Sequence, residues 1–166
     1  GERVRVGASE RWRVVRMDAR GKRTLLREDA RWIHDVALDA RGRIVALARF
    51  EGDHDALYRV RADGTLRDVL RLQAMERLDL LAAPADGSLL MTGNPGSAAA
   101  GGDFRRVMRL DANDRLQTLH QDPRGEADLD DVVVDPRTQQ PLAASYRSTV
   151  AATYGIGGAQ GVVADI

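Results

Sequence analysis

The sequence predicts an all-β protein built from repeated four-stranded antiparallel sheets. Turn markers recur along the 166 residues at intervals of 21 to 27 positions. Short runs rich in valine, leucine and isoleucine flank each marker, as expected of strands. Asp, Asn and Gly predominate around the turns, and these residues tolerate the positive φ that tight hairpins require. The markers are Gly21, Gly42, Gly64, Gly87, Asp114 and Thr138.

Two kinds of hairpin alternate along the chain. One kind occupies 14–21, 58–64 and 107–114, and the other occupies 36–45, 81–90 and 133–138. Together they give two hairpins every 43 to 51 residues. A four-stranded unit of that size is typical of one blade of a β-propeller. The fold class predicted is therefore all-β, with two complete propeller blades and two partial ones.

The first elements in order are a half-blade and a whole blade. The half-blade spans 11–28 with strands at 12–17 and 23–28, and residues 3–6 offer one further strand. The whole blade spans 33–71. Its strands are expected at 33–38, 43–50, 56–61 and 66–71.

A second whole blade and a second half-blade follow. The whole blade spans 78–120, and its strands are expected at 78–83, 88–92, 105–111 and 116–120. The half-blade spans 129–147, where Val132, Val133 and Val134 form an apolar run typical of an inner strand. Residues 1–148 thus form the propeller segment. Residues 149–166 form a Gly- and Ala-rich tail that offers two weak closing strands.

Composition excludes several functional classes. Lys and Arg number 25, as do Asp and Glu, so no basic excess favours nucleic acid as a partner. The chain contains no cysteine, which excludes disulfides, thiolate zinc sites and cysteine nucleophiles. No apolar run approaches the roughly 20 residues of a membrane span. We therefore expect a soluble chain with no membrane partner.

The segment 119–146 resembles propeller blades of bacterial prolyl-oligopeptidase-like serine peptidases. In those blades an acidic stretch leads into a hairpin like Asp135-Pro136-Arg137-Thr138, followed by a Pro-Leu-Ala strand as at 141–143. Segments 39–46 and 57–64 are similar to earlier blades, and the resemblance covers 12–146. Gln139-Gln140 departs from it, because the family usually has a turn glycine there. The tail after Tyr146 also departs from the strand expected next.

The resemblance implies a division of labour between two domains. In that family an α/β-hydrolase domain carries a Ser-Asp-His triad, and the propeller gates access to it. This sequence has no Gly-x-Ser-x-Gly elbow, so we assign no catalytic residue and no cofactor. The expected partners are a hydrolase domain or missing blades of the same protein, with a peptide as substrate. The expected location is a bacterial cytoplasm or periplasm.

Two other functions remain open. The first is a stand-alone propeller-type interaction or sensor domain, completed by its own tail or by a second copy. The second is a small lactonase-like enzyme with a metal in the propeller channel. Its inner strands would offer mainly Asp35 and Asp79 as ligands.

Candidate ligand- or partner-facing residues lie in the loops opposite the hairpin turns. They are Glu51, Asp53, His54, Asp55, Asn94, Asp103, Asp122, Glu126 and Asp128. Three carboxylates and an imidazole within 51–55 have the composition of a cation site, but adjacent side chains in a tight loop rarely converge, so we expect no metal.

We assign structural roles to the histidines and to several arginines. His34, His54 and His120 are too dispersed in the sequence to suggest an acid–base pair. Several arginines fall in the third strands of the blades, where alternation predicts solvated positions that need no ligand. They are Arg13, Arg16, Arg59, Arg61, Arg105, Arg106 and Arg109.

Overall fold

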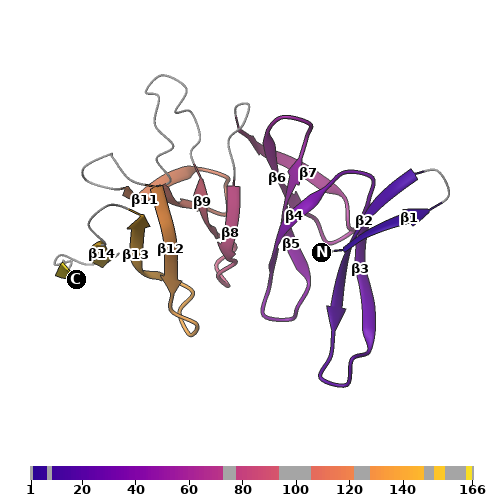
Figure 1. Ribbon diagram of the computed structural model, residues 1–166, viewed down its shortest axis with the longest axis horizontal. Coiled ribbons are helices and arrows are strands. Elements are labelled where there is room, and N and C mark those ends of the chain that lie inside the picture. The colour runs from indigo at the N-terminus through magenta and orange to yellow at the C-terminus, as the bar shows by residue number, and fades with distance from the viewer. Residues whose placement is uncertain are drawn as a thin grey trace.

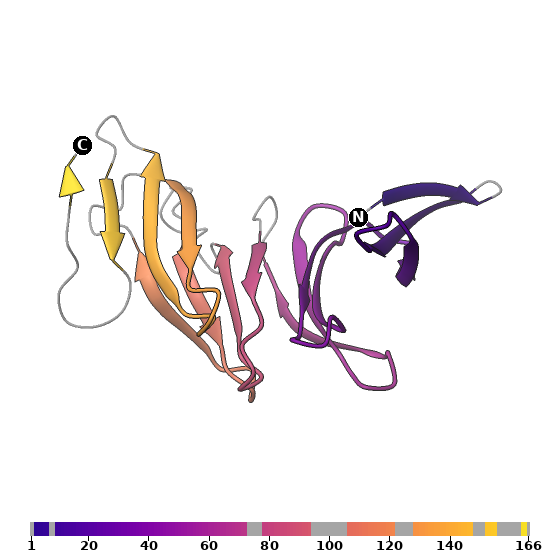
Figure 2. The ribbon, with the colours of Figure 1, turned by 90° about the horizontal axis from the view of Figure 1, so that it is seen from below.

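The computed structural model describes residues 2–6, 9–72, 78–93, 106–121, 128–147, 152–155 and 164–165. These residues contain strands and turns and no helix. They form four antiparallel sheets that follow one another along the chain (Figure 1). The predicted all-β class and the repeated four-stranded sheets are confirmed. The described sheets do not close into a ring, and the first and fourth stand at opposite ends of an open row (Figure 2).

Each sheet is a meander whose neighbouring strands are consecutive in sequence. The first sheet contains β1 (Glu2–Val6), β2 (Ser9–Met17) and β3 (Arg23–Asp29). The second contains β4 (Ile33–Leu38), β5 (Ile44–Phe50), β6 (Asp55–Val60) and β7 (Leu66–Arg71). The third contains β8 (Leu78–Ala82), β9 (Leu89–Gly93), β10 (Arg106–Leu110) and β11 (Leu116–Gln121). The fourth contains β12 (Asp128–Val134), β13 (Pro141–Arg147), β14 (Ala152–Gly155) and β15 (Ala164–Asp165).

The two terminal sheets contain more strands than the half-blades predicted. β1 pairs with β2 from Glu2 opposite Arg13 to Val6 opposite Ser9, which makes the first sheet three-stranded. The tail supplies β14 and β15, which extend the β12–β13 hairpin into a four-stranded sheet.

Four of the described hairpin turns have the same pair of backbone hydrogen bonds, and they begin at Asp18, Asp39, Arg61 and Asp111. At 39–43 the Asp39 amide donates to the Arg43 carbonyl, and the Gly42 amide donates back to the Asp39 carbonyl at 2.8 Å. The Asp39 carboxylate also accepts the amides of Arg41 and Arg43. In every other described hairpin turn an aspartate carboxylate also accepts at least one turn amide, although Asp63 and Asp86 stand two positions later in their turns than Asp39 does. These carboxylates belong to Asp18, Asp63, Asp86, Asp111 and Asp135.

Positive φ occurs at five of the six predicted markers, and the sixth is displaced by one residue. Asp114 has φ 62°, which matches the glycines at the other turns. In the last turn Gln139, and not Thr138, has positive φ, at 57°. The Gln139 amide donates to the Asp135 carbonyl at 2.7 Å, so this turn contains one more residue before its left-handed position.

Apolar side chains of the middle strands alternate between two cores. In β5, Ala46 and Ala48 pack in the cluster between the second and third sheets. Leu47, between them in sequence, packs with Val14 in the cluster between the first and second sheets. A smaller cluster joins β10 to the fourth sheet through Val107. This arrangement explains the uninterrupted buried runs in β6 and β9, since both faces of a middle sheet are covered.

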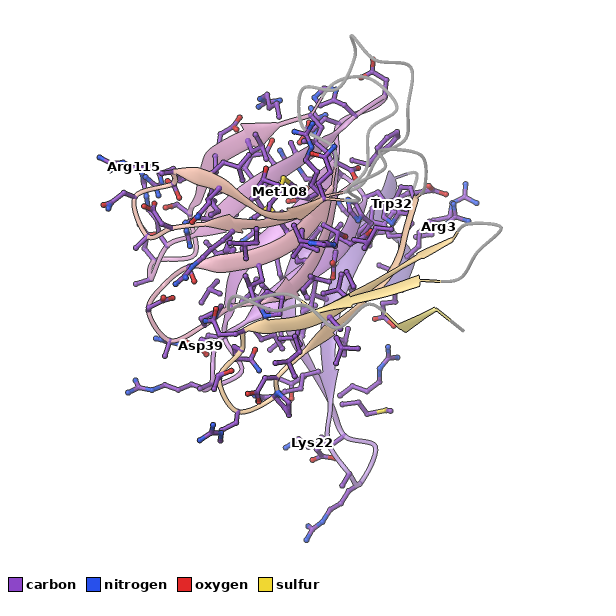
Figure 3. All side chains as sticks on the ribbon, turned by 90° about the vertical axis from the view of Figure 1, so that its left-hand side faces the viewer. Arg3, Lys22, Trp32, Asp39, Met108 and Arg115 are labelled. Carbon is purple, nitrogen blue, oxygen red and sulfur yellow. The ribbon has the colours of Figure 1, made fainter. Side chains whose placement is uncertain are left out.

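Turns and loops lie at opposite ends of the sheets. The turn end contains the hairpin turns, such as those bearing Lys22 and Asp39 (Figure 3). The loop end contains the connection between β5 and β6, residues 51–54 (Figure 1). Trp32 lies toward the loop end (Figure 3). Successive first strands are neighbours, because β8 contacts both β4 and β12.

Candidate functional site at the loop end

The predicted site residues divide into three groups. Glu51, Asp53 and His54 lie in the loop between β5 and β6, while Asp55 begins β6. Asp128 begins β12 and is opposite Arg147 in the strand register. Four further predictions, on Asn94, Asp103, Asp122 and Glu126, fall outside the described residues. The loop-end site is therefore built around the second sheet.

Glu51 is held by three neighbouring side chains. The Tyr58 hydroxyl donates to Glu51 Oε1 at 2.8 Å, and Arg49 Nε donates to the same oxygen at 2.5 Å. Arg31 Nη1 lies 2.5 Å from Oε2. Burial favours a higher pKa for Glu51, but the hydrogen bonds from Tyr58 and Arg49 and the charge of Arg31 outweigh it, and the pKa is lowered. Glu51 is thus an ionised, internally bonded carboxylate.

Arg49 connects the first sheet to the second. Its Nη1 donates to Asp29 Oδ2 at 3.2 Å, at the end of β3. Its guanidinium carbon lies 4.4 Å from the centroid of the Tyr58 ring, within the range of a cation–π contact. Burial and the hydrogen bond to Glu51 raise the pKa of Tyr58, which keeps the phenol protonated at neutral pH. The network fixes the base of the loop.

An aromatic cluster adjoins this network. Trp32 has its ring centroid 5.6 Å from that of Trp12, 5.8 Å from Phe50 and 6.0 Å from His34. The Phe50 amide donates to the Trp32 carbonyl at 2.9 Å. Trp32 remains 39% exposed. Beside it the Arg31 side chain is also largely exposed, so an aromatic ring and a cation face outward together.

Asp55 was expected to face a ligand, but it is fully buried. Its Oδ2 accepts the Leu78 amide at 2.8 Å and lies 3.1 Å from His34 Nε2. Its carbonyl accepts the Leu72 amide. A buried carboxylate is retained only where it is hydrogen-bonded or paired, and here it joins β6 to β4 and β8. Asp55 is therefore structural.

Asp35, in β4 of the same sheet, has a comparable role. Its Oδ2 accepts the amide of Leu80 in β8, and its Oδ1 accepts the Val36 amide at 2.8 Å. Burial raises the pKa of Asp35, although these two backbone hydrogen bonds oppose the shift. Both oxygens are thus engaged within the protein. Among the described residues, no three His, Asp or Glu side chains are arranged to hold a metal ion.

One arginine predicted to be solvated instead bonds to the neighbouring sheet. Arg59 donates from Nε to Asp114 Oδ1 at 2.7 Å, from Nη1 to the Gly87 carbonyl at 2.8 Å and from Nη2 to the Asp111 carbonyl at 2.7 Å. Its side chain is 15% exposed. Strand alternation could not reveal this, because the three acceptors lie in turns of the third sheet.

Among the described residues, two hollows lie at the turn end. One, of about 640 Å³, lies among the turns that join the first two strands of the second, third and fourth sheets, with Leu38, Pro84 and Pro136 in its lining. The other, of about 490 Å³, lies between the first and second sheets and is lined by arginines.

Comparison with family models and with curated sequences gives no relative for the chain. No protein-family model matches it, and no curated protein sequence matches it. A search of the described residues for a helix long and apolar enough to cross a bilayer finds none.

Proposed function

We propose that this chain is a non-catalytic section of a β-propeller that docks a hydrolase domain and gates its substrates. The architecture that supports this is a series of antiparallel meanders whose first strands are neighbours, with turns at one end and loops at the other. Propellers use this arrangement to present a binding end on a rigid scaffold. The partner, a serine-hydrolase domain acting on peptides, comes from the resemblance of 119–146 to prolyl-oligopeptidase-like peptidases.

Trp32 and Arg31, which are adjacent in sequence and both exposed, carry the proposal for the docking end. Tryptophan and arginine are enriched where interfaces derive most of their binding energy. Glu51 positions Arg31, and Trp12 and Phe50 support Trp32 from the sides. The outward-facing groups are therefore held in place before a partner arrives, which lowers the entropic cost of binding.

A fluorophosphonate probe, which labels active serines, tests whether the catalytic serine lies outside these residues. The isolated 166-residue chain is expected to remain unlabelled, while the full-length product of its gene is expected to be labelled at a serine outside these residues. In that full-length protein, Trp32→Ala is expected to increase cleavage of large peptides relative to small ones. Leu116→Ala is the matched control, since Leu116 is 40% exposed but starts β11 beside a turn. If the full-length protein is not labelled, the proposed serine-peptidase function is wrong.

A stand-alone interaction domain is the second candidate. It is favoured by β14 and β15, since the tail that contains them completes the fourth sheet. Sedimentation of the isolated chain distinguishes the two candidates. A discrete, folded monomer or dimer supports a self-sufficient domain, whereas aggregation through incomplete sheet ends supports a section of a larger propeller.

A further inference from the structure

The second and third sheets contain equivalent turns with different residues at one key position. In the second sheet the Arg61 amide donates to Thr65 and the Gly64 amide donates to Arg61. In the third sheet Asp111 and Asp114 make the same two bonds. Gly64 and Asp114 also share positive φ, at 82° and 62°. The two turns therefore have the same backbone hydrogen bonds, and Asp114 occupies the position of Gly64.

Asp114 neutralises arginines at the junction of the second and third sheets. Its carboxylate accepts Arg59 Nε and forms an ion pair with Arg67. Arg59 uses its other nitrogens on turn carbonyls, including that of Gly87. All three donor nitrogens of this guanidinium therefore have acceptors, and the junction is complete without any external group.

The junction of the first and second sheets has the arginine but lacks the carboxylate. Arg16 occupies the position equivalent to Arg59, two residues before the turn. Its Nη1 lies 3.3 Å from where a Cβ would stand on Gly42, the counterpart of Gly87. At Gly64, among the described residues, no atom lies within 4 Å of where a Cβ would point. The space that the Asp114 side chain fills in one junction is open in the other.

Arginines surround that open space. Five arginines line the hollow of about 490 Å³, which we call the arginine groove. They are Arg16, Arg27, Arg41, Arg43 and Arg61, and no acidic residue is among the described lining. Arg43 is neutralised by Asp39 at 2.7 Å. Arg27 donates to the Gly64 carbonyl at 3.1 Å and lies 3.9 Å from Asp29, but its buried Nε has no acceptor in the described structure.

The other three guanidiniums have no carboxylate within ion-pair distance in the described part of the chain. They belong to Arg16, Arg41 and Arg61. Asp63 is close enough for its charge to be felt by Arg61, but its Oδ1 is hydrogen-bonded to Thr65. The groove therefore retains positive charge, although the whole sequence has equal numbers of acidic and basic residues.

We propose that the arginine groove binds a phosphate group, which takes the place of the missing carboxylate beside Gly64. Guanidinium groups match the oxygens of a phosphate bidentately, and a dianion suits several unpaired arginines better than one carboxylate does. The ligand is free phosphate or a small phosphate monoester, since the balanced net charge gives no attraction for a long polyanion. This inference is independent of the proposed hydrolase partner.

Thermal unfolding and calorimetric titration of the chain with inorganic phosphate test the site, with glycerol 3-phosphate as the monoester arm. Both anions are expected to raise Tm, and sodium chloride at equal ionic strength is not. A stronger response to one of the two identifies the source of the phosphate group. Equal responses to phosphate and chloride would mean charge screening alone and would reject the site.

Gly64→Asp is the decisive variant, because it supplies the carboxylate that Asp114 supplies in the third sheet. We expect no rise in Tm with phosphate. Gly64→Asp and the control below both place a side chain at positive φ, so Tm without phosphate should be higher in Gly64→Asp than in that control. Gly21→Asp is the matched control, since Gly21 also has positive φ and open space but lies outside the groove. This control should retain the phosphate response, and retention by Gly64→Asp as well would overturn the proposal.

Arg16→Gln keeps the proposal testable if Gly64→Asp fails to fold. Loss of one charge-assisted contact should weaken phosphate binding about tenfold. Arg109→Gln removes the equivalent arginine of the third sheet, which forms an ion pair with Asp86 outside the groove. Equal affinity losses in the two variants would contradict a local site.

Discussion

The second sheet is joined to the third by opposite chemistry at its two ends. At the loop end, carboxylates of the second sheet accept hydrogen bonds from amides of β8. Asp55 accepts the Leu78 amide, and Asp35 accepts the Leu80 amide. At the turn end, the Arg59 guanidinium donates to carbonyls of the third sheet. In both places a charged side chain of one sheet bonds to backbone groups of the next. Sheet docking in this protein therefore depends on a few charged residues as well as on the apolar core.

The two ends differ most in burial. Asp55 has no exposed surface, whereas the Arg59 side chain is 15% exposed. If Arg59 is removed, water can hydrogen-bond to some of the carbonyl groups that lose their donor. If Asp55 is removed, water cannot easily reach the buried Leu78 amide, which is left without an acceptor. The comparison thus predicts a graded series of effects.

The largest effect is expected for Asp55→Ala. The change leaves the Leu78 amide without its acceptor and His34 without its carboxylate neighbour, which should cost about 3 to 5 kcal/mol of unfolding free energy. Urea denaturation measures it. Asp53→Ala is the control, because the Asp53 side chain is 68% exposed, and it should change stability very little. A loss below about 1 kcal/mol for Asp55→Ala would show that the loop-end contacts are dispensable.

A smaller loss is expected for Arg59→Ala. Three charge-assisted hydrogen bonds disappear, but partial exposure reduces their net contribution to about 1 to 3 kcal/mol. The control is Arg109→Ala, whose ion pair with the more exposed Asp86 should contribute at most about 1 kcal/mol. Denaturation midpoints of the two variants should therefore separate, and coincidence would remove the distinction between bridging and surface arginines.

Acid should act on Glu51 and Asp35 in opposite directions. The Glu51 pKa is below its ordinary value of 4.5, so its stabilisation is present above that value and is lost as the pH falls through the lowered pKa. The Asp35 pKa is above 3.8, so folded protein takes up that proton first and gains relative stability as the pH falls. Unfolding free energy measured from pH 7 to 3 should decline less steeply in Glu51→Gln and more steeply in Asp35→Asn. Identical slopes would contradict the assignment.

The smallest effect is expected in the last hairpin turn. Gln139→Gly relieves a side chain at φ 57° and should stabilise the chain by at most about 1 kcal/mol. Thr138→Gly should destabilise it, because the Thr138 hydroxyl donates to Asp135 at 2.8 Å. Thermal shifts of opposite sign would distinguish the two positions, and shifts of the same sign would not fit this turn geometry.

Turns and strands were predictable because their causes are local. The residues that set φ and accept the turn amides lie within four positions of one another, as Asp39, Gly42 and Arg43 show. Expected and observed strands agree closely from β4 to β11. The marker predicted at Thr138 was wrong by one residue, because this turn contains an extra position and no glycine, and Gln139 has the positive φ.

The contacts of Asp55 and Arg59 could not be predicted from their surroundings in the sequence. The groups of the third sheet to which these two side chains bond lie 23 to 55 residues away in the sequence. Their burial depends on how neighbouring sheets stack, which strand alternation within one sheet does not describe. The repeats already show that Asp114 stands where four other turns have glycine. That the space beside Gly64 is open and lined by arginines is known only from the structure.

The alternation of Ala46, Leu47 and Ala48 between two cores has a consequence for cooperativity. A middle sheet cannot bury its apolar residues unless both neighbours are folded, so its stability is shared with theirs in the manner of stacked repeats. Unfolding should then begin at the terminal sheets and proceed inward. Amide hydrogens of β5 and β9 should exchange with solvent most slowly, and those of β1 should exchange first.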